Sequence, residues 1–182
     1  MQKPFHLLIV IIAIAICFVS CTQDETPPEI TTWEFPFYVE YSVNGEVFVI
    51  EDTIICDFNG LIKGHGHNTS MRRDWSQKLK STNNTDTRVV IIKEGSKESI
   101  FSDRINSSSR ICLSLGGAEY YMGEPKYDKI EKPCFYYEEY FRHSTGPLTS
   151  ERTILTEEQL KEFFNIEIIQ FSFSPPVENT FK

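Results

Sequence analysis

Alternation of apolar and polar residues dominates the middle of the chain. From Phe37 to Val43 every second residue is apolar, and Asn44-Gly45 separates this run from a second apolar run at 46–50. Side chains of a strand alternate between its two faces, so a period of two predicts strands. Asn and Gly both tolerate the positive φ angles of a type I′ turn. The segment therefore predicts a β-hairpin.

Several further segments carry short apolar or aromatic runs that are typical of strands. They are 53–58, 88–93, 110–115, 119–122, 133–141 and 166–174. Between them, 81–87 and 102–109 are rich in Ser, Asn, Thr and Asp and are predicted to be loops. The pattern predicts a β-dominated domain of mostly antiparallel strands.

A helix is predicted at 157–164. Thr156 and Gln159 have the spacing of a capping box, in which each side chain binds the other residue's backbone N–H. Leu160, Phe163 and Phe164 then share one helical face at spacings of three and four, and Asn165 can adopt the left-handed conformation that ends a helix.

A second helix is predicted at 70–80, because Met71, Trp75 and Leu79 recur every four residues. With one or two short helices beside many strands, the predicted fold class is α+β, as a single domain over 33–182. No internal repeat or change in composition marks a second domain.

The chain has 182 residues, of which 24% are charged and 13% aromatic, a composition of globular rather than disordered proteins. Its formal net charge is −8, so an anionic surface repels it and nucleic acid is not an expected partner.

The first twenty-one residues predict export. Lys3 precedes an apolar run from Leu7 to Val19, which has the length of a signal peptide and is too short to span a bilayer comfortably. The run ends at Ser20-Cys21, and residues 18–21 resemble the lipobox of bacterial lipoproteins, although Phe18 stands where that family usually has an aliphatic residue. The resemblance implies that 1–20 are removed and that Cys21 carries a covalent lipid.

This resemblance implies a protein anchored by lipid in the bacterial cell envelope, outside the cytoplasmic membrane. Residues 21–32 are polar, acidic and contain prolines, so we interpret them as a tether between lipid and domain. Asp24-Glu25 is similar to the acidic export signal of some Bacteroidetes lipoproteins, which implies the outer membrane or the cell surface. The alternative to an export signal at Asp24-Glu25 is a plain solvated linker. The alternative to a lipoprotein leader is a simple signal peptide or an uncleaved anchor helix.

Three cysteines remain after Cys21. Cys56 and Cys112 lie in apolar, strand-like surroundings and are expected to be small buried hydrophobic residues. One disulfide, which would leave Cys134 or another thiol free, is the alternative.

His65 and His67 form the one metal-like arrangement in the sequence. On an extended backbone residues i and i+2 share a face, so both imidazoles could bind one zinc ion, with His143, Asp57 or Asp74 as a further ligand. The alternative is a glycine-rich turn whose histidines are solvated.

Five cations lie close together in an otherwise acidic chain. They are Lys63, Arg72, Arg73, Lys78 and Lys80. Arg72 and Arg73 on the predicted second helix could bind a phosphate, an acidic glycan or an acidic protein. A charged helix face that keeps the protein soluble is the more common explanation.

An aromatic and acidic cluster occupies 135–141. Tyr136, Tyr137 and Tyr140 could stack on sugar rings, although packing in the core explains aromatic residues on a strand equally simply. Glu138 and Glu139 are adjacent and would point to opposite faces of a strand, so they cannot form a glycosidase acid/base pair.

Sequence motifs of nucleophilic hydrolases, zinc proteases and phosphate-binding loops are absent. The sequence therefore favours a non-enzymatic binding or interaction module of the envelope, with a protein or a glycan as partner and no cofactor beyond the lipid on Cys21. The alternatives are a metal-binding lipoprotein or metal-dependent hydrolase built on His65 and His67, and a structural subunit of an envelope assembly.

Overall fold

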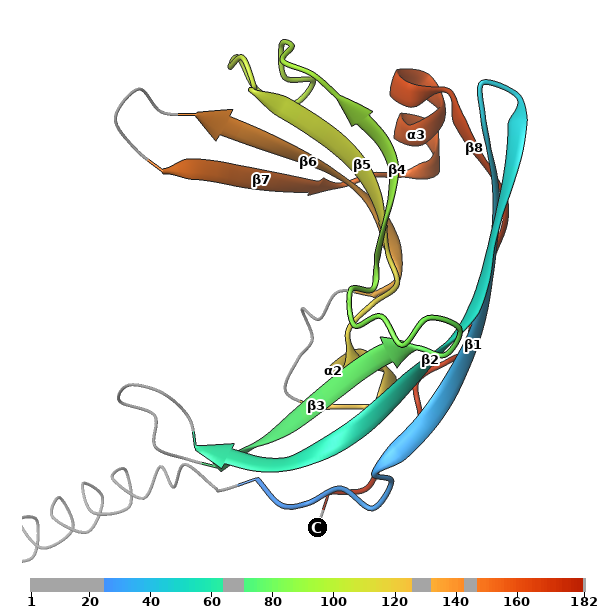
Figure 1. Ribbon diagram of the computed structural model, residues 1–182, viewed down its shortest axis with the longest axis vertical. Helices are drawn as coiled ribbons and strands as arrows, with labels where there is room; N and C mark the ends of the chain where they lie inside the picture. Colours follow the sequence, from blue (N-terminus) through green and yellow to red (C-terminus); the bar gives the residue numbers. More distant parts are fainter. Residues whose placement is uncertain (1–24, 64–70, 126–131, 143–146, 182) are drawn as a thin grey trace, which may run out of the picture.

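The computed structural model describes residues 25–63, 71–125, 132–142 and 147–181. Within these residues, eight strands and two short helices form two antiparallel four-stranded sheets. The prediction of a β-dominated protein is confirmed. Figure 1 shows that both sheets are strongly curved and that together they form a C-shaped shell.

The first sheet has the order β3-β2-β1-β8, and the second has the order β4-β5-β6-β7. The strands of the first sheet are β1 (Thr32–Val43), β2 (Glu46–Lys63), β3 (Met71–Leu79) and β8 (Ile166–Phe173). Those of the second are β4 (Arg88–Glu94), β5 (Ser108–Ser114), β6 (Cys134–Arg142) and β7 (Leu148–Ile154). Consecutive strands pair within each sheet, and β8 returns to pair with β1.

The predicted hairpin is confirmed as β1 and β2. Asn44 and Gly45 have φ angles of 52° and 87°, and Val43 pairs with Glu46 across the turn. The turn also contacts the far end of the chain, because the Asn44 backbone N–H donates to the Asn165 carbonyl at 3.1 Å.

The predicted C-terminal helix is confirmed as α3 (Glu157–Phe164). Its capping box is complete: the Gln159 N–H donates to Thr156 Oγ1 at 3.3 Å, and the Thr156 N–H donates to Gln159 Oε1 at 3.0 Å. Asn165 ends the helix with a φ of 52°. Leu160 and Phe164 are buried, as their spacing predicts, but Phe163, which was expected on the same face, is 42% exposed.

The predicted helix at 70–80 is wrong, because the segment forms strand β3. Residues four apart share a face in a strand as well as in a helix, since four is also a multiple of two. Met71, Trp75 and Leu79 therefore line one face of β3, and Arg73 lies between them on the same face.

The predicted strand at 119–122 is also wrong. Residues 119–121 belong to α2 (Ala118–Tyr121), a single helical turn, Met122 is its C-cap, and Gly123 follows with a positive φ. The Tyr121 hydroxyl donates to the Leu115 carbonyl at 2.6 Å, and its ring lies 4.7 Å from that of Phe35. Strand β7 was not predicted, since its residues are mostly exposed and polar.

The core lies between the two sheets. Phe35, Val39 and Ile54 of the first sheet and Ile111 and Leu113 of the second are almost completely buried in one cluster. Aromatic contacts join the layers, and α3 lies against both of them.

Two of the three cysteines that follow Cys21 are inaccessible. Cys56 and Cys112 are fully buried free cysteines, so the expectation that they are small buried hydrophobic residues is confirmed. Burial raises the pKa of Cys56 to about 12.

The N-terminal segment from Glu25 lies against the domain. The Glu25 backbone N–H donates to the Met71 carbonyl at 3.1 Å, and the Ile30 N–H donates to Asn179 Oδ1 at 3.0 Å. Pro28 pairs with Phe181, so both ends of the described chain lie side by side (Figure 1). The described part of the predicted tether is therefore bound to β3 and to the C-terminal segment. Neither α2 nor α3, the helices of the described ranges, is long enough to cross a membrane.

Candidate functional site

The predicted zinc ligands His65 and His67 lie outside the described residues, as does His143. Asp57 and Asp74 are described, and each accepts a hydrogen bond from a neighbouring side chain. Among the residues that the structure describes, no three His, Cys, Asp or Glu side chains are grouped around a possible metal position. Zinc binding stays a prediction, and so does lipidation of Cys21, which also precedes the described part of the chain.

The predicted basic patch is divided between the two faces of β3. Arg72 is exposed, whereas Arg73 points to the opposite face and is buried. Lys78 forms an ion pair with Asp57 of β2, and Lys80 forms one with Glu34 of β1. The described cations of this cluster therefore do not form one continuous surface.

Arg73 is the centre of a buried network. Its Nε and Nη2 donate to the two carboxylate oxygens of Glu124 at 2.5 and 2.8 Å, and its Nη1 donates to the Thr26 carbonyl at 2.9 Å. The Trp75 indole N–H donates to the same Glu124 carboxylate at 2.8 Å, and the guanidinium carbon lies 4.0 Å from the centre of the Phe181 ring. The network joins β3 to both ends of the described chain.

The predicted tyrosine cluster is divided in the same way. Tyr137 faces the core, where its ring lies 5.3 Å from that of Phe164. Tyr136 and Tyr140 lie on the other face of β6, and Tyr136 is only 4% exposed. A sugar ring needs an exposed aromatic face for stacking, and Tyr140 alone of the three is partly exposed.

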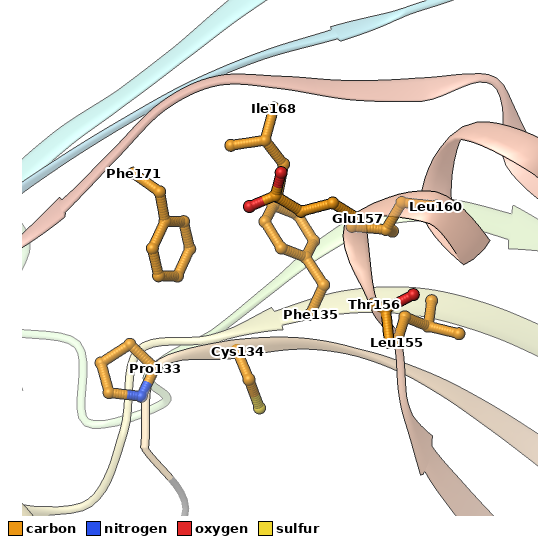
Figure 2. A pocket seen from close by; sticks show the side chains of 9 residues that line it. All are labelled: Pro133, Cys134, Phe135, Leu155, Thr156, Glu157, Leu160, Ile168 and Phe171. Atoms are coloured by element: carbon orange, nitrogen blue, oxygen red, sulfur yellow. The ribbon is translucent and has the colours of Figure 1, made fainter.

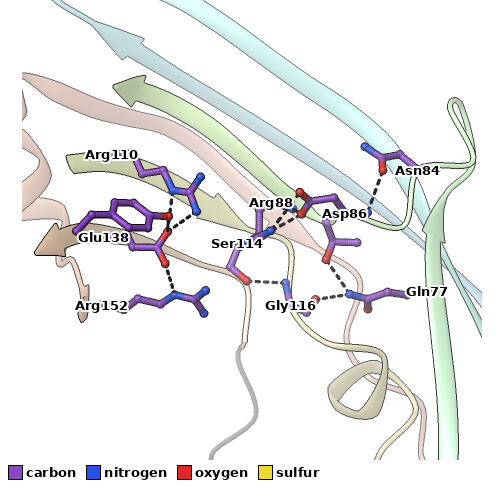
Figure 3. Close-up of polar contacts among 11 residues, drawn as sticks. Gln77, Asn84, Asp86, Arg88, Arg110, Ser114, Gly116, Glu138 and Arg152 are labelled. Atoms are coloured by element: carbon purple, nitrogen blue, oxygen red, sulfur yellow. Dashed lines mark hydrogen bonds and ion pairs between the residues drawn. The ribbon is translucent and has the colours of Figure 1, made fainter. Parts of the chain in front are cut away.

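Glu138 lies on the same face of β6 as Tyr136 and Tyr140. Together with one arginine from each neighbouring strand it forms a charged row across three strands (Figure 3). Arg110 of β5 and Arg152 of β7 stand opposite it, with Nε–Oε distances of 2.7 and 2.9 Å. Burial disfavours the carboxylate form of Glu138, but hydrogen bonds from Arg152, Arg110 and Tyr140 outweigh this effect, so that its pKa lies below the ordinary value. The row stabilises the ionised carboxylate.

Glu139 points to the opposite face, as its position next to Glu138 predicts. Its carboxylate accepts hydrogen bonds from Ser99 Oγ at 2.6 Å and from Asn106 Nδ2 at 2.7 Å. These bonds fasten the connection between β4 and β5 over the core. The two carboxylates therefore serve different structural roles.

An apolar cleft lies where the start of β6, α3 and β8 meet (Figure 2). Its volume is about 220 Å³. It is lined by Pro133, Cys134, Phe135, Leu155, Thr156, Glu157, Leu160, Ile168 and Phe171. Phe135 and Leu160 form its buried part, while Phe171 at the mouth is 39% exposed. No sequence motif marks this cleft, because its residues come from segments that are distant in the chain.

Carboxylates surround one side of this cleft. Glu157 is the charged residue of its lining, and its side chain extends from the first turn of α3 toward the apolar residues (Figure 2). An adjoining hollow shares Glu157 and Ile168 with the cleft and adds Glu158, Lys161 and Glu167. Lys161 is paired with Glu167 at 3.6 Å, so the side of the cleft toward α3 has a net negative charge.

The cleft adjoins an edge of each sheet. Among the described strands, β8 pairs with β1 alone and β7 pairs with β6 alone. Ile169 and Phe171 of β8 are 51% and 39% exposed, and Ile154 at the end of β7 is 71% exposed. Exposed apolar edge strands favour pairing with another chain.

Comparison of the chain with protein-family models, with curated proteins and with solved structures gives no match.

Proposed function

We propose that the protein is a bacterial envelope lipoprotein that acts as a non-enzymatic binding module. Lipid on Cys21 anchors it outside the cytoplasmic membrane, in the outer membrane or at the cell surface. The leader and the lipobox-like residues 18–21 support the anchor. Anchoring requires no cofactor beyond this covalent lipid. The molecule that the module binds is another component of the envelope, a protein or a glycan.

The apolar cleft between β6, α3 and β8 is the observation that carries the proposal of binding. Pockets for drug-sized ligands and cofactors usually have volumes of roughly 300–1,000 Å³. At about 220 Å³, the cleft has room for a smaller group, such as one large side chain. A cleft of this size beside an exposed sheet edge favours a protein partner.

Photocrosslinking in intact cells tests this function. The full chain would carry a photoreactive phenylalanine analogue in place of Phe171, and a matched chain would carry it in place of Glu40, which lies on β1 and does not line the cleft. We expect a discrete adduct of constant mass from position 171 and none from position 40. Equal patterns from the two positions would contradict the proposal.

Metabolic labelling tests the anchor separately. An alkyne-bearing palmitate should label the full chain, and Cys21→Ser should abolish both the label and the recovery of the protein in the membrane fraction. Unchanged labelling of the variant would contradict lipidation at this position.

Zinc binding by His65 and His67 is the second candidate function, favoured by their Gly-His-Gly-His spacing. Elemental analysis of the purified chain distinguishes it from the first. Close to one zinc per chain, lost in His65→Ala, supports a metal-binding lipoprotein, and no zinc after reconstitution contradicts it.

A further inference from the structure

We infer that the cleft binds an extended basic segment of a partner protein, with one aliphatic or aromatic side chain of that segment seated between Phe135, Leu160 and Phe171. This inference rests on the proposed function, and it specifies the chemistry of the partner.

The apolar lining selects the group that enters the cleft. Phe135 and Leu160 are 3% and 1% exposed, so the floor is buried and apolar. Burial of one leucine or phenylalanine side chain on such a floor removes apolar surface from water on both partners. An anchor of this kind, inserted in a side-chain-sized pocket, is typical of the dominant contact in a protein interface.

The charge around the cleft selects what flanks the anchor. Glu157 belongs to the lining, and Glu158 and Glu167 lie in the adjoining hollow. Lysine or arginine residues on either side of the anchor would meet these carboxylates. Complementary charge of this kind mainly accelerates association and excludes acidic partners.

The same charges argue against a second copy of this chain as the occupant. The chain has a formal net charge of −8, and a symmetric contact at the cleft would bring the carboxylates of two copies together. A basic segment from a different protein avoids this repulsion.

The edge of β8 explains why the segment is extended. Among the described strands, β8 has a sheet neighbour on one side, and Ile168 and Phe171 of this strand line the cleft. A peptide that adds a strand to this edge would satisfy backbone groups of β8 and direct alternate side chains toward the cleft.

Binding of synthetic peptides to the full chain, solubilised in a non-ionic detergent, tests the inference. The probe is a nine-residue peptide with a central leucine, alternating lysines and threonines on both sides, and blocked ends. Its affinity would be measured by fluorescence anisotropy. We expect the peptide with serine in place of leucine to bind at least about tenfold more weakly. Glutamates in place of the lysines should remove detectable binding.

Variants of the chain locate the site. Phe171→Ser removes part of the mouth and should weaken the lysine peptide by about fivefold or more. Glu157→Gln should weaken it by about two- to fivefold and reduce its salt dependence. Glu162→Gln is the matched control, because Glu162 is exposed on the same helix but lines neither the cleft nor the adjoining hollow. Circular dichroism would verify that each variant is folded.

Two results would overturn the inference. Equal affinity for lysine and glutamate peptides would contradict the role of charge, and equal effects of Glu157→Gln and Glu162→Gln would contradict the location. If no peptide binds while position 171 still gives its adduct in cells, the basic extended partner is wrong and the binding function stands. If position 171 gives no adduct in cells and no peptide binds, both the basic extended partner and the proposed binding function are wrong.

Discussion

Arg73 and Glu124 form a bidentate ion pair between β3 and the residues that follow α2, with side chains that are 3% and 1% exposed. Removal of one member would leave a buried charge without its counter-ion. We expect Arg73→Met to lower the free energy of unfolding by about 3–5 kcal/mol. Urea titration of residues 21–182, followed by tryptophan fluorescence, would measure the change.

The neighbouring residue supplies the control for this ion pair. Arg72 is exposed on the other face of the same strand, so Arg72→Met should change the free energy of unfolding by no more than about 0.5 kcal/mol. Similar losses for the two variants would contradict the structural role of the Arg73–Glu124 pair.

Gly123 should tolerate substitution less well than Gly45. Both have positive φ angles, of 71° and 87°, so alanine is strained at either position. A Cβ atom at Gly123 would lie 2.4 Å from the Val177 carbonyl oxygen, whereas no atom lies within 4 Å of one at Gly45. We expect Gly123→Ala to cost about 1–3 kcal/mol more than Gly45→Ala in thermal or urea unfolding. Equal costs would show that the C-terminal segment does not pack against α2.

Glu138 should make stability depend on pH in the acidic range. Its pKa is lower in the folded chain than in the unfolded chain, so the ionised carboxylate stabilises the fold fully above the unfolded-state value of about 4.3. This contribution is lost as the pH falls through the folded-state pKa. Glu138→Gln should therefore cost about 1–3 kcal/mol at pH 7, and the difference from the wild type should shrink toward pH 3. Urea titrations at several pH values would measure both, and a difference independent of pH would contradict the charge-dependent role.

Cys56 should resist alkylation in the folded protein. Its side chain is fully buried, and burial raises its pKa to about 12, so little thiolate is present at pH 8. Mass spectrometry after treatment with iodoacetamide should find this residue unmodified in buffer and modified in urea. Modification at equal rates in the two conditions would contradict its burial.

Much of the fold follows from local pattern. The Asn44-Gly45 turn and the capping box of α3 are predicted correctly, because each depends on a few adjacent residues whose backbone preferences agree with the final structure. For strand β3, by contrast, the local pattern does not distinguish a strand from a helix. Arg73 and Gln77 lie on its inward face, and their polarity hides the alternation that would have revealed a strand.

The candidate site could not be predicted from the sequence. Phe135, Leu160 and Phe171 each follow an ordinary pattern of their own element, and their common cleft depends on how α3 is placed between the two sheets. Tyr136 and Tyr137 show the opposite case, in which the sequence suggests a shared site that these two residues do not form. Their aromatic character suggested a surface for sugars, whereas the structure buries both rings on opposite faces of β6.

The attachment of Glu25 to β3 would limit the height of the domain above a membrane if Cys21 carries lipid, as proposed. Three residues lie between Cys21 and Glu25, so four Cα–Cα steps join them, which corresponds to no more than about 14 Å of extended backbone. Acylation of Cys21 would therefore keep the β3 end of the molecule near the headgroups, while α3, at the far end of the shell in Figure 1, would point away from them. Such a protein has a defined upper side, and a partner would have to approach it from the medium rather than along the bilayer.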